Sequence, residues 1–490
     1  MASNYERNLF KQFEEALIKI DFLMKENQAL RAEIVTLKES HQKETMALHA
    51  KIESLDAENR KLKDIINKNS SNSSKPPSSD GFKKIHNSRE KTGKTVGGQK
   101  GHKGHSLELY DKPTEIVEHR KELCHCGGHF IYSDEYKVKQ AVDIGFKIYI
   151  VEHRAYLKGI CDRCDTEFSN ELPKELNNPV TYGNNLRSFS ALLSAEGIVS
   201  ICRIKQIISE LTDGVLDLSE GTIVNFNKKL SSKVKPVIEH IKEKLLTSPV
   251  NHKDETGIKT NGVTNWLHVL SNKEQTLYTA HKRRGIEADK AADVLPSYSG
   301  VLVHDHAKWL YKFKCEHSEC NAHILRYLKS AFENEKRAWA KDMIELLVGA
   351  NNSIKELKAN SISCFSDICV QEYYDKYDVI INNGENEFKA DLKINNNYNG
   401  EDMKLLRRMK EFKIEHLLFI SNFNVPFDNN LAERDLRMIK AKIKISGCFR
   451  SDNGGEIFAN IKSYTSTLRK NKKNLFQGIS LAFNNNPVFV

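Results

Sequence analysis

The sequence predicts a multidomain protein of the α+β class, and three patterns along the chain carry this prediction. A heptad repeat of apolar residues at 5–67 is typical of a coiled-coil helix. Cysteine pairs between strand-like segments at 111–180 indicate a small zinc-ribbon-like β module. From residue 247 onward, short apolar runs alternate with helical patterns, as in a sheet covered by helices. At 490 residues, the chain is too long for a single hydrophobic core.

Composition is typical of a globular protein of the cytoplasm. Apolar residues make up 39% of the chain. The sequence contains no apolar run of about 18 residues, the length that could span a membrane. The opening "MASNYERNLFKQF" lacks the apolar segment of a signal peptide. Ten cysteines in so long a chain favour reduced thiols and metal ligands over a disulfide framework. We therefore expect a cytoplasmic protein that has no contact with membranes.

The heptad pattern at 5–67 predicts a parallel, dimeric coiled coil. Two seam positions run through the first heptads: Phe13, Ile20, Asn27 and Ile34 in one, Ala16, Leu23, Leu30 and Leu37 in the other. After a slip of four residues, a stutter, the seam resumes with Leu48, Ile52, Leu55, Asn59, Leu62 and Ile66. Asparagine at a seam position fixes register and partner number. The alternative is one long amphipathic helix folded onto the rest of the protein.

The segment 68–110 reads as a basic arm with almost no side chains to bury, so we expect it to be disordered alone. Between Lys68 and His105, nine Lys or Arg face two acids, and the segment therefore carries +7 of the net charge of +10. That concentration favours contact with nucleic acid over a plain solvated linker. The candidate contacts are Lys83, Lys84, Lys91, Lys94, Lys100 and Lys103.

The segment 111–180 predicts a structural zinc site. "CDRC" gives Cys161 and Cys164 the usual two-residue gap, whereas "CHCGG" leaves one residue between Cys124 and Cys126. Because that gap is short, His125 or His129 could replace one of the thiolates. The alternative is four reduced cysteines without metal.

Apolar residues at three- and four-residue spacing predict several short helices at 181–246, with Ser219 as an N-cap. Glycines between these helices fit a helix-turn-helix group that binds DNA. Packing against a neighbouring domain is the competing interpretation.

Acidic residues follow two strand-like segments in the first part of the predicted core, 247–324. "SPVNHKDETG" suggests a short strand that ends at Asp254, and "GVLVHDHA" a strand that leads to Asp305. Between them lie two further strands, "NWLHVLS" and "QTLYTAHK", joined by a polar link, and a helix, "GIEADKAADVL". This order matches a ribonuclease H-like core, in which the first and fourth strands are neighbours. Two carboxylates brought together there would repel each other, and a divalent cation would compensate.

A third acid is expected from the second part of the core, 416–475. Glu433 in "DNNLAERDLR" is the preferred candidate, and Asp435 and Glu456 are alternatives. Two structural interpretations compete: a capping box with Asn430, and a surface pair with Arg437. Basic residues after this helix are candidates for phosphate contact, with a solvated basic face as the alternative: Lys442, Lys444 and Arg450.

The 128 residues that separate Asp305 from Glu433 exceed what the core needs. We expect a helical insertion at 325–415 and a C-terminal tail at 476–490. Four residues just before the insertion could form a second zinc site: Cys315, His317, Cys320 and His323. Packing or phosphate contact near the catalytic centre is the preferred interpretation. His304 and His306, which flank Asp305, are expected to support the site or contact phosphate, with solvent exposure as the alternative.

A series of motifs in one order from about residue 65 to 475 resembles transposases of the insertion-sequence family numbered sixty-six, within the DDE transposase superfamily. They are "NSSNSSKPPSSD", "GGQKGHKGHS", "CHCGG", "CDRC", "HKDETG", "VHDHAKW", "CNAHILRYL", "DNNLAERDLR", "KISGCFRS" and "TLRKN". The resemblance implies Asp254, Asp305 and Glu433 as the catalytic triad. Further active-site candidates are His304, His306, Cys320, His323 and Arg437.

The same resemblance implies that the protein binds the ends of an insertion sequence and catalyses DNA cleavage and strand transfer. Its cofactors would be two Mg²⁺ (or Mn²⁺) ions in the catalytic site and structural Zn²⁺. Its partners would be transposon-end and target DNA, a second or further copy through the coiled coil, and helper proteins of the element. The compartment would be the bacterial cytoplasm, at the nucleoid. The alternatives are a catalytically inactive, transposase-derived repressor and a stand-alone nuclease.

Overall fold

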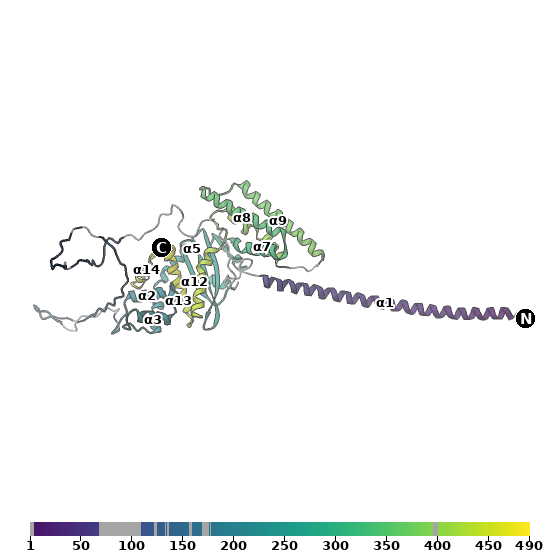
Figure 1. Cartoon of the computed structure of the whole chain (residues 1–490), viewed down its shortest axis with the longest axis horizontal. Helices are drawn as coiled ribbons and strands as arrows, with labels where there is room; N and C mark the ends of the chain where they lie inside the picture. The colour runs from purple at the N-terminus through teal and green to yellow at the C-terminus, as the bar shows by residue number, and fades with distance from the viewer. Residues whose placement is uncertain are drawn as a thin grey trace. The chain divides into compact units, whose positions relative to one another are not determined.

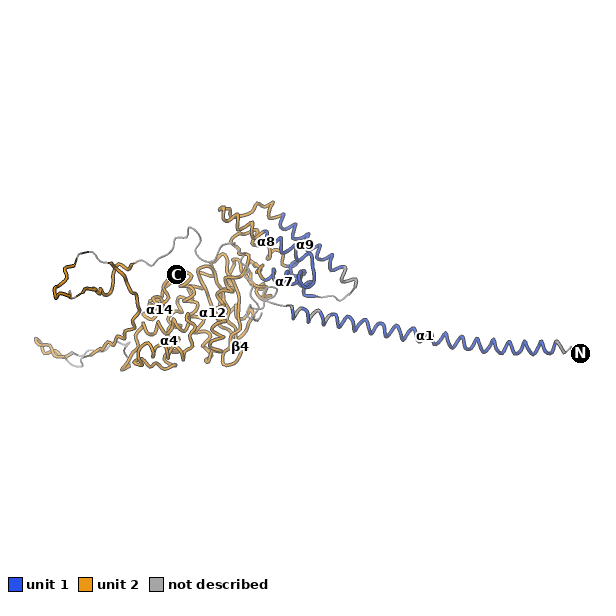
Figure 2. The backbone as a smooth tube through the Cα atoms, viewed as in Figure 1, with its two compact units in different colours: residues 1–83, 323–349, 372–411 blue, residues 84–322, 350–371, 412–490 orange. Residues whose placement is uncertain are grey.

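The computed structural model describes residues 4–67, 109–121, 125–132, 134, 137–155, 159–168, 176, 178–394 and 400–490. The chain forms two compact units (Figure 2). The first, here the helical unit, comprises residues 1–83, 323–349 and 372–411. The second, here the sheet unit, comprises residues 84–322, 350–371 and 412–490. All three candidate catalytic acids therefore belong to the sheet unit.

Helix α1 (Asn4–Asn67) occupies the predicted coiled-coil segment as one continuous helix (Figure 1). The apolar seam side chains along it are exposed, among them Leu23, Leu30 and Leu55. A monomer therefore leaves the whole seam in water, which is unfavourable for so many large apolar side chains. The predicted helix is present, and its pairing with a second copy stays a prediction.

The predicted insertion is helical. Its elements are α7 (Asn321–Glu335), α8 (Ala338–Ala359), α9 (Asp367–Ile394) and α10 (Glu401–Glu411). In the helical unit, Trp339 and Tyr377 are fully buried, and the Tyr377 hydroxyl donates to the Met409 carbonyl at 2.9 Å. Close packing depends on Gly384, because a Cβ there would lie 2.8 Å from Leu406 Cδ1 and 2.9 Å from Trp339 Cγ.

The sheet unit is built on a five-stranded mixed sheet of order β5-β4-β3-β6-β7. Its strands are β3 (Val250–Thr260), β4 (Val263–Ser271), β5 (Thr276–His281), β6 (Val301–His304) and β7 (Glu316–Glu319). Strands β3, β4 and β5 pair antiparallel, whereas β6 pairs parallel with both β3 and β7. Helix α6 (Ile286–Ala291) and two 3₁₀ turns, Leu295–Ser297 and Leu310–Lys312, flank β6. The predicted adjacency of the first and fourth strands is confirmed.

One prediction about the strands is wrong, and one strand was not predicted. Strand β3 does not end at Asp254 but continues to Thr260, because β4 pairs with it along that whole stretch. Asn261 and Gly262, both with positive φ, close this hairpin tightly. In addition, the segment proposed for a second zinc site contains β7, a short edge strand that polar residues had obscured.

Both faces of the sheet are covered by helices. Neighbouring residues in β4, Val269 and Leu270, belong to two separate hydrophobic clusters, since alternate side chains of a strand point to opposite faces. One cluster includes α12 (Asn430–Ser446) and α13 (Gly454–Lys470), which pack against β3, β4 and β5 (Figure 1). At the edge of the sheet, α11 (Lys413–Ser421) contacts β7.

The larger cluster joins the sheet to the helices expected to form a separate DNA-binding domain. These are α2 (Asn184–Ala195), α3 (Ile201–Glu210), α4 (Glu220–Lys233) and α5 (Lys235–Leu246). Ser219 caps α4 as predicted, accepting from the Thr222 amide at 3.0 Å. The expected C-terminal tail is wrong, because α14 (Leu475–Phe483) packs against α2 with Ile479 and Ala482 fully buried in this cluster. The packing interpretation of 181–246 therefore has direct support.

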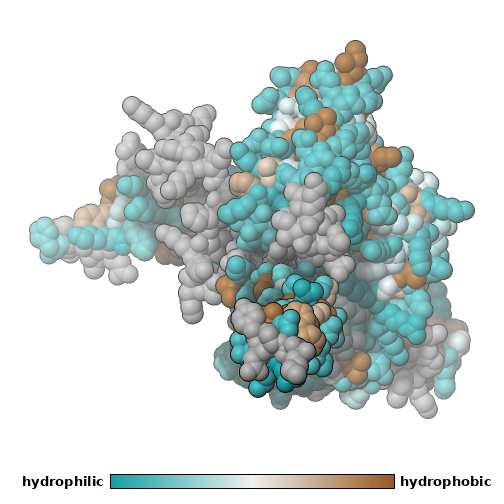
Figure 3. Space-filling view, turned by 90° about the vertical axis from the view of Figure 1, so that its right-hand side faces the viewer, coloured by the Kyte–Doolittle hydropathy of each residue, from teal (hydrophilic) through white to brown (hydrophobic). Residues whose placement is uncertain are grey.

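The face of the molecule seen in Figure 3 is mostly polar. In the view of Figure 3, hydrophilic residues dominate the coloured area and hydrophobic residues form small separate patches. In the described part of the chain, every helix is too short or too polar to cross a membrane.

Candidate active site

The sheet brings Asp254 and Asp305 together. Strand β3 pairs in parallel with β6 from Val250↔Val301 to His252↔Val303. The same register, extended by two residues, aligns Asp305 with Asp254. Burial and the Asp305 carboxylate, which is close enough to act on it, raise the pKa of Asp254. Asp305 follows the last residue of β6 directly, so the two carboxylates come from the middle of one strand and the end of its neighbour.

The negative charge at Asp254 is compensated only in part by protein cations, because Lys253 lowers its pKa less than burial and the nearby carboxylates raise it. Burial, together with the carboxylates of Asp305 and Glu255, raises the pKa of the Asp254 carboxyl to about 7. The amide of Glu255 donates to Asp254 Oδ1 at 2.8 Å and opposes this shift only in part. Glu255 itself accepts from Arg284 at 2.8 Å. The site thus holds close carboxylates that a cation would stabilise.

Glu433 lies in the first turn of α12, and Asn429 fixes where this helix begins. The Asn429 side chain donates through Nδ2 to the Lys253 carbonyl at 2.8 Å, and its Oδ1 accepts from His252 Nδ1 at 3.0 Å. Its backbone amide donates to Cys320 Sγ at 3.1 Å. Since Asn429 is almost fully buried, these contacts hold the start of α12 beside the part of β3 that carries Asp254.

The alternatives to Glu433 have other surroundings. Asp435 pairs with Lys470 at 2.9 Å, and its backbone carbonyl accepts from the Tyr278 hydroxyl. Glu456 is exposed in the first turn of α13. The N-cap of α12 is Asn429 rather than Asn430, and its side chain makes no capping hydrogen bond, so the capping-box interpretation is wrong. Arg437 is exposed.

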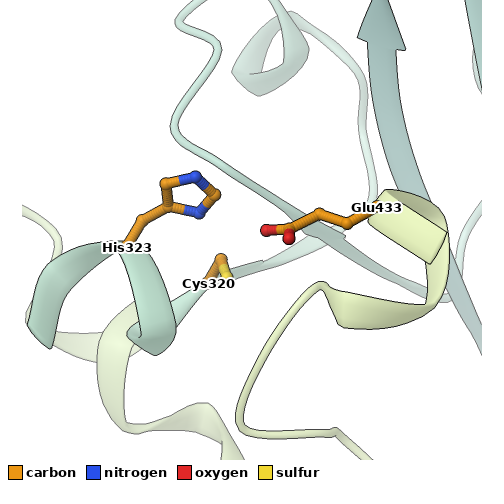
Figure 4. Close-up of side chains that lie close together, drawn as sticks. All are labelled: Cys320, His323 and Glu433. Carbon is orange, nitrogen blue, oxygen red and sulfur yellow. The ribbon is translucent and has the colours of Figure 1, made fainter. Parts of the chain in front are cut away.

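Cys320, His323 and Glu433 offer ligand atoms that all lie within 4.8 Å of one another (Figure 4). Cys320 is buried, and its backbone amide donates to the His304 carbonyl at 2.8 Å, one residue before Asp305. His323 follows three residues later, on the first turn of α7. This group of metal-capable side chains was not predicted as such, because Glu433 is distant in the sequence.

The four residues of the weaker zinc hypothesis do not form one ligand set among the described residues. Cys315 Sγ lies 3.8 Å from His317 Nε2, while His317 Nδ1 faces His304 Nε2 at 3.2 Å. Cys320 and His323 group with Glu433 instead. Burial lowers the pKa of His317 and raises that of Cys315 to about 11, so this pair is neutral.

The histidines beside Asp305 support the structure around it, and the solvent-exposed alternative is wrong. His304 is fully buried. His306 has a positive φ of 68°, and its Nδ1 contacts Glu319, a buried carboxylate that also accepts from the Tyr311 hydroxyl at 2.6 Å. The His306 ring packs edge-on against Phe412. The turn after Asp305 is therefore held by several side chains.

The predicted phosphate contacts differ in exposure. Lys442 is buried and its Nζ donates to the Ser194 carbonyl at 3.3 Å, which joins α12 to α2. Burial lowers the pKa of this ammonium group. Lys444 and Arg450 are exposed. The candidate contacts of the arm (Lys83, Lys84, Lys91, Lys94, Lys100 and Lys103) lie outside the described residues.

One half of the predicted zinc module has the expected local shape. Cys161 and Cys164 lie in a turn between β1 (Gly159–Ile160) and β2 (Glu167–Phe168), which pair antiparallel. Hydrogen bonds from Thr166 and Cys161 lower the pKa of the Cys164 thiol, which favours the thiolate that zinc requires.

The other half of the module does not complete the site. Cys124 lies outside the described residues, and Cys126 does not group with Cys161 and Cys164 in the part of the chain that the structure describes. His125 and His129, the alternative ligands, are exposed. The zinc site stays a prediction.

The middle of the chain matches a known protein family. The model of a family described as "Transposase IS66 family" matches residues 180–457, more than half of the chain. The model of a family of unknown function, DUF6444, matches residues 8–108. No curated protein matches the chain. The first match spans Asp254, Asp305, Glu433 and the helical insertion.

Proposed function

Because the chain belongs to the IS66 family of transposases, we propose that it binds the ends of an insertion sequence and catalyses DNA cleavage and strand transfer at Asp254, Asp305 and Glu433. The observation that carries the proposal is the placement of Asp305 opposite Asp254 on neighbouring strands, with the start of the Glu433 helix tied to β3. The strand order supports a ribonuclease H-like core.

The donor set fits divalent metal ions. Burial, first, and the carboxylates of Asp305 and Glu255 raise the pKa of Asp254, and Lys253 offsets this only in part. Carboxylate oxygens are the ligands that Mg²⁺ and Mn²⁺ prefer. Asp254, Asp305 and Glu433 would hold these ions. When bound, the ions would stabilise the charge that develops on the phosphate and on the attacking and leaving oxygens.

The chemistry would consist of two in-line displacements at phosphorus. In the first, water oxygen bonds to the phosphorus at a transposon end while the bond to the 3′-oxygen breaks, leaving a 3′-hydroxyl. In the second, that hydroxyl attacks a phosphodiester of target DNA, whose own 3′-oxygen departs. The side chains hold the reacting groups in place, and no covalent bond to the protein forms.

Basic residues supply candidate DNA contacts. We propose Lys444 and Arg450, which are exposed, and the lysines of the arm at 68–110. For Lys442 the burial of Nζ against α2 favours a structural role. We also propose that the module at 111–180 binds structural zinc. Helper proteins encoded by the element are proposed as further partners.

Two copies acting together would hold both transposon ends in one complex. The exposed seam of α1 supports pairing of two chains through this helix, since it leaves large apolar side chains in water along the seam. The family matched at 8–108 has no stated function and adds nothing to this proposal.

The test is a strand-transfer assay with the element's own ends and Mg²⁺. The wild-type protein should cut the ends and join them to target DNA. Replacing any one of Asp254, Asp305 or Glu433 by its amide should reduce both steps by about 10³ or more while end binding persists.

Two outcomes would contradict this function. Binding without cutting by the wild-type protein would favour the transposase-derived repressor. Cutting without joining would favour a nuclease. Activity of Glu433→Gln together with inactivity of Asp435→Asn or Glu456→Gln would place the third acid elsewhere.

A further inference from the structure

We infer that Asp289 is a positioning residue that sets the segments carrying Asp254 and Asp305 relative to each other. Each of its two carboxylate oxygens binds one of these segments. This inference rests on the proposed function, since it concerns the two acids assigned to the reaction. Asp289 lies in α6, away from every motif that pointed to function.

The first link runs through Lys253 to Asp254. Lys253 precedes Asp254 in β3, so its side chain points to the opposite face of the strand. Its Nζ lies 3.1 Å from Asp289 Oδ1 and donates to the backbone carbonyl of Asp254 at 3.4 Å. The buried ammonium therefore joins Asp289 to the backbone of the metal-binding residue itself.

The second link runs through Trp309 to the segment after Asp305. The indole Nε1 of Trp309 donates to Asp289 Oδ2 at 3.0 Å. Trp309 is four residues beyond Asp305, in the turn that leads to the Leu310–Lys312 3₁₀ helix. Because Asp289 is buried, at 1% exposure, we expect this hydrogen bond to limit how far the turn after Asp305 can move.

The surrounding charges explain why an acid is needed at this position. Lys253 is 2% exposed, and a buried ammonium group requires a counter-charge. His268, whose Nδ1 accepts from Lys253 at 2.9 Å, cannot supply one, because burial and Lys253 lower its pKa to about 2. Glu255 is farther away, at 4.0 Å, and is engaged by Arg284. Asp289 is thus the closest negative partner of Lys253 among the described residues.

The decisive variant is Trp309→Phe, because it removes the hydrogen bond to Asp289 and leaves the Lys253–Asp289 pair intact. Trp266→Phe is a matched control. Both indoles lie against the Arg284 guanidinium, at 5.5 Å for Trp309 and 5.0 Å for Trp266, and only Trp309 bonds to Asp289 among the described contacts. A difference between the two variants reports the hydrogen bond rather than loss of an indole.

Two measurements on the full-length protein, both made without DNA, compare these variants. Calorimetric titration with Mg²⁺ should show affinity reduced by about tenfold in Trp309→Phe, as for loss of a hydrogen bond that orients metal ligands, and by less than twofold in Trp266→Phe. Hydrogen exchange of the metal-free protein should be faster over residues 305–312 in Trp309→Phe alone. Equal behaviour of the two variants in both measurements would overturn the inference.

A second variant removes both links of Asp289, to Lys253 and to Trp309, without leaving a buried charge unpaired. Lys253→Met combined with Asp289→Leu removes both charges together, which folded proteins often tolerate. Circular dichroism should show a folded protein whose Mg²⁺ affinity is again reduced by about tenfold. Wild-type affinity in this folded double variant would also overturn the inference. Absence of strand transfer by the wild-type protein would count against the proposed function alone, since none of these readouts involves DNA.

Discussion

Asn429 donates a hydrogen bond from its side-chain amide to the backbone carbonyl of Lys253, 2.8 Å away and one residue before Asp254. Two residues distant in the sequence thereby connect the helix that carries the third acid to the strand that carries the first. This contact holds the start of α12 beside the part of β3 that leads to Asp254.

Replacing Asn429 by alanine should impair the site more than the fold. The change removes two buried side-chain hydrogen bonds and should lower the free energy of unfolding by about 1–3 kcal/mol. Cleavage should fall by a larger factor than that loss of stability explains, because the start of α12 is released. Asn424→Ala, an exposed asparagine in the same loop, is the control for kinetics and denaturation. Equal activities of the two variants would refute a role for Asn429 in the site.

Stability of the metal-free protein should depend on pH through Asp254. Its pKa is about 7 in the folded protein and near 3.8 when the chain is unfolded, so the folded state retains a proton that the unfolded state releases. This contribution is fully present below the unfolded pKa and is lost as pH rises through 7. Chemical denaturation from pH 5 to 8 should show it, and Asp254→Asn should flatten the profile. The idea fails if the variant keeps the wild-type slope, and Mg²⁺ should restore stability at pH 8 in the wild type only.

Lys442 and Lys444 should give opposite phenotypes although they are two residues apart. Lys444→Ala, like Arg450→Ala, should weaken binding to all DNA sequences and reduce the slope of log affinity against log salt by about 1. Lys442→Ala should instead lower the melting temperature, since it removes the link between α12 and Ser194. Binding across a salt series and thermal unfolding separate the two effects. A normal salt slope in Lys444→Ala would return that residue to a solvated face.

Gly384 and Gly349 provide a paired test of packing in the helical unit. An added Cβ at Gly384 would meet Leu406 and Trp339 at under 3 Å, so Gly384→Ala should destabilise the protein by about 1–3 kcal/mol. Gly349, in α8, has open space around the same position, so Gly349→Ala should be neutral or stabilise by up to about 1 kcal/mol. Thermal unfolding measures both. Similar shifts in the two variants would mean that the packing around Gly384 is looser than the structure shows.

Association through α1 should depend on the seam. Leu30→Lys combined with Leu55→Lys should yield monomers in sedimentation equilibrium, because two charges would enter the predicted dimer core. Val35→Lys, an exposed apolar residue off the seam, should leave the assembly unchanged. Replacing Asn27 and Asn59 by leucine should strengthen association and give trimers or larger species beside dimers. A wild-type monomer at tens of micromolar would remove the dimer from the proposal.

The sequence was sufficient for features that repeat or follow one another locally. Heptads predicted α1, and two strand-like segments followed by acids, in an order that matches a ribonuclease H-like core, predicted that Asp254 and Asp305 come together. It could not reveal contacts made by single residues across long stretches of chain. Nothing local distinguishes Asn429 from Asn430, or Asp289 from other helix acids, until the strands that they contact are in place. The same limit hid β7, whose polar residues lack a strand pattern, and α14, whose apolar residues find their partners on α2.

The packing of α14 on α2 also sets a condition on how the protein is made. Ile479 and Ala482 complete a cluster that includes Ala191 and Ala195, and Gln275 in the turn between β4 and β5 bonds to the Val490 carbonyl at 3.0 Å. A ribosome must therefore synthesise the chain beyond Phe483 before the core around β6 can close. Until then the nascent chain holds all three acids but lacks the packing that supports their arrangement. Completion of α14, rather than synthesis of the acidic residues, would then set the moment at which the site can take its shape.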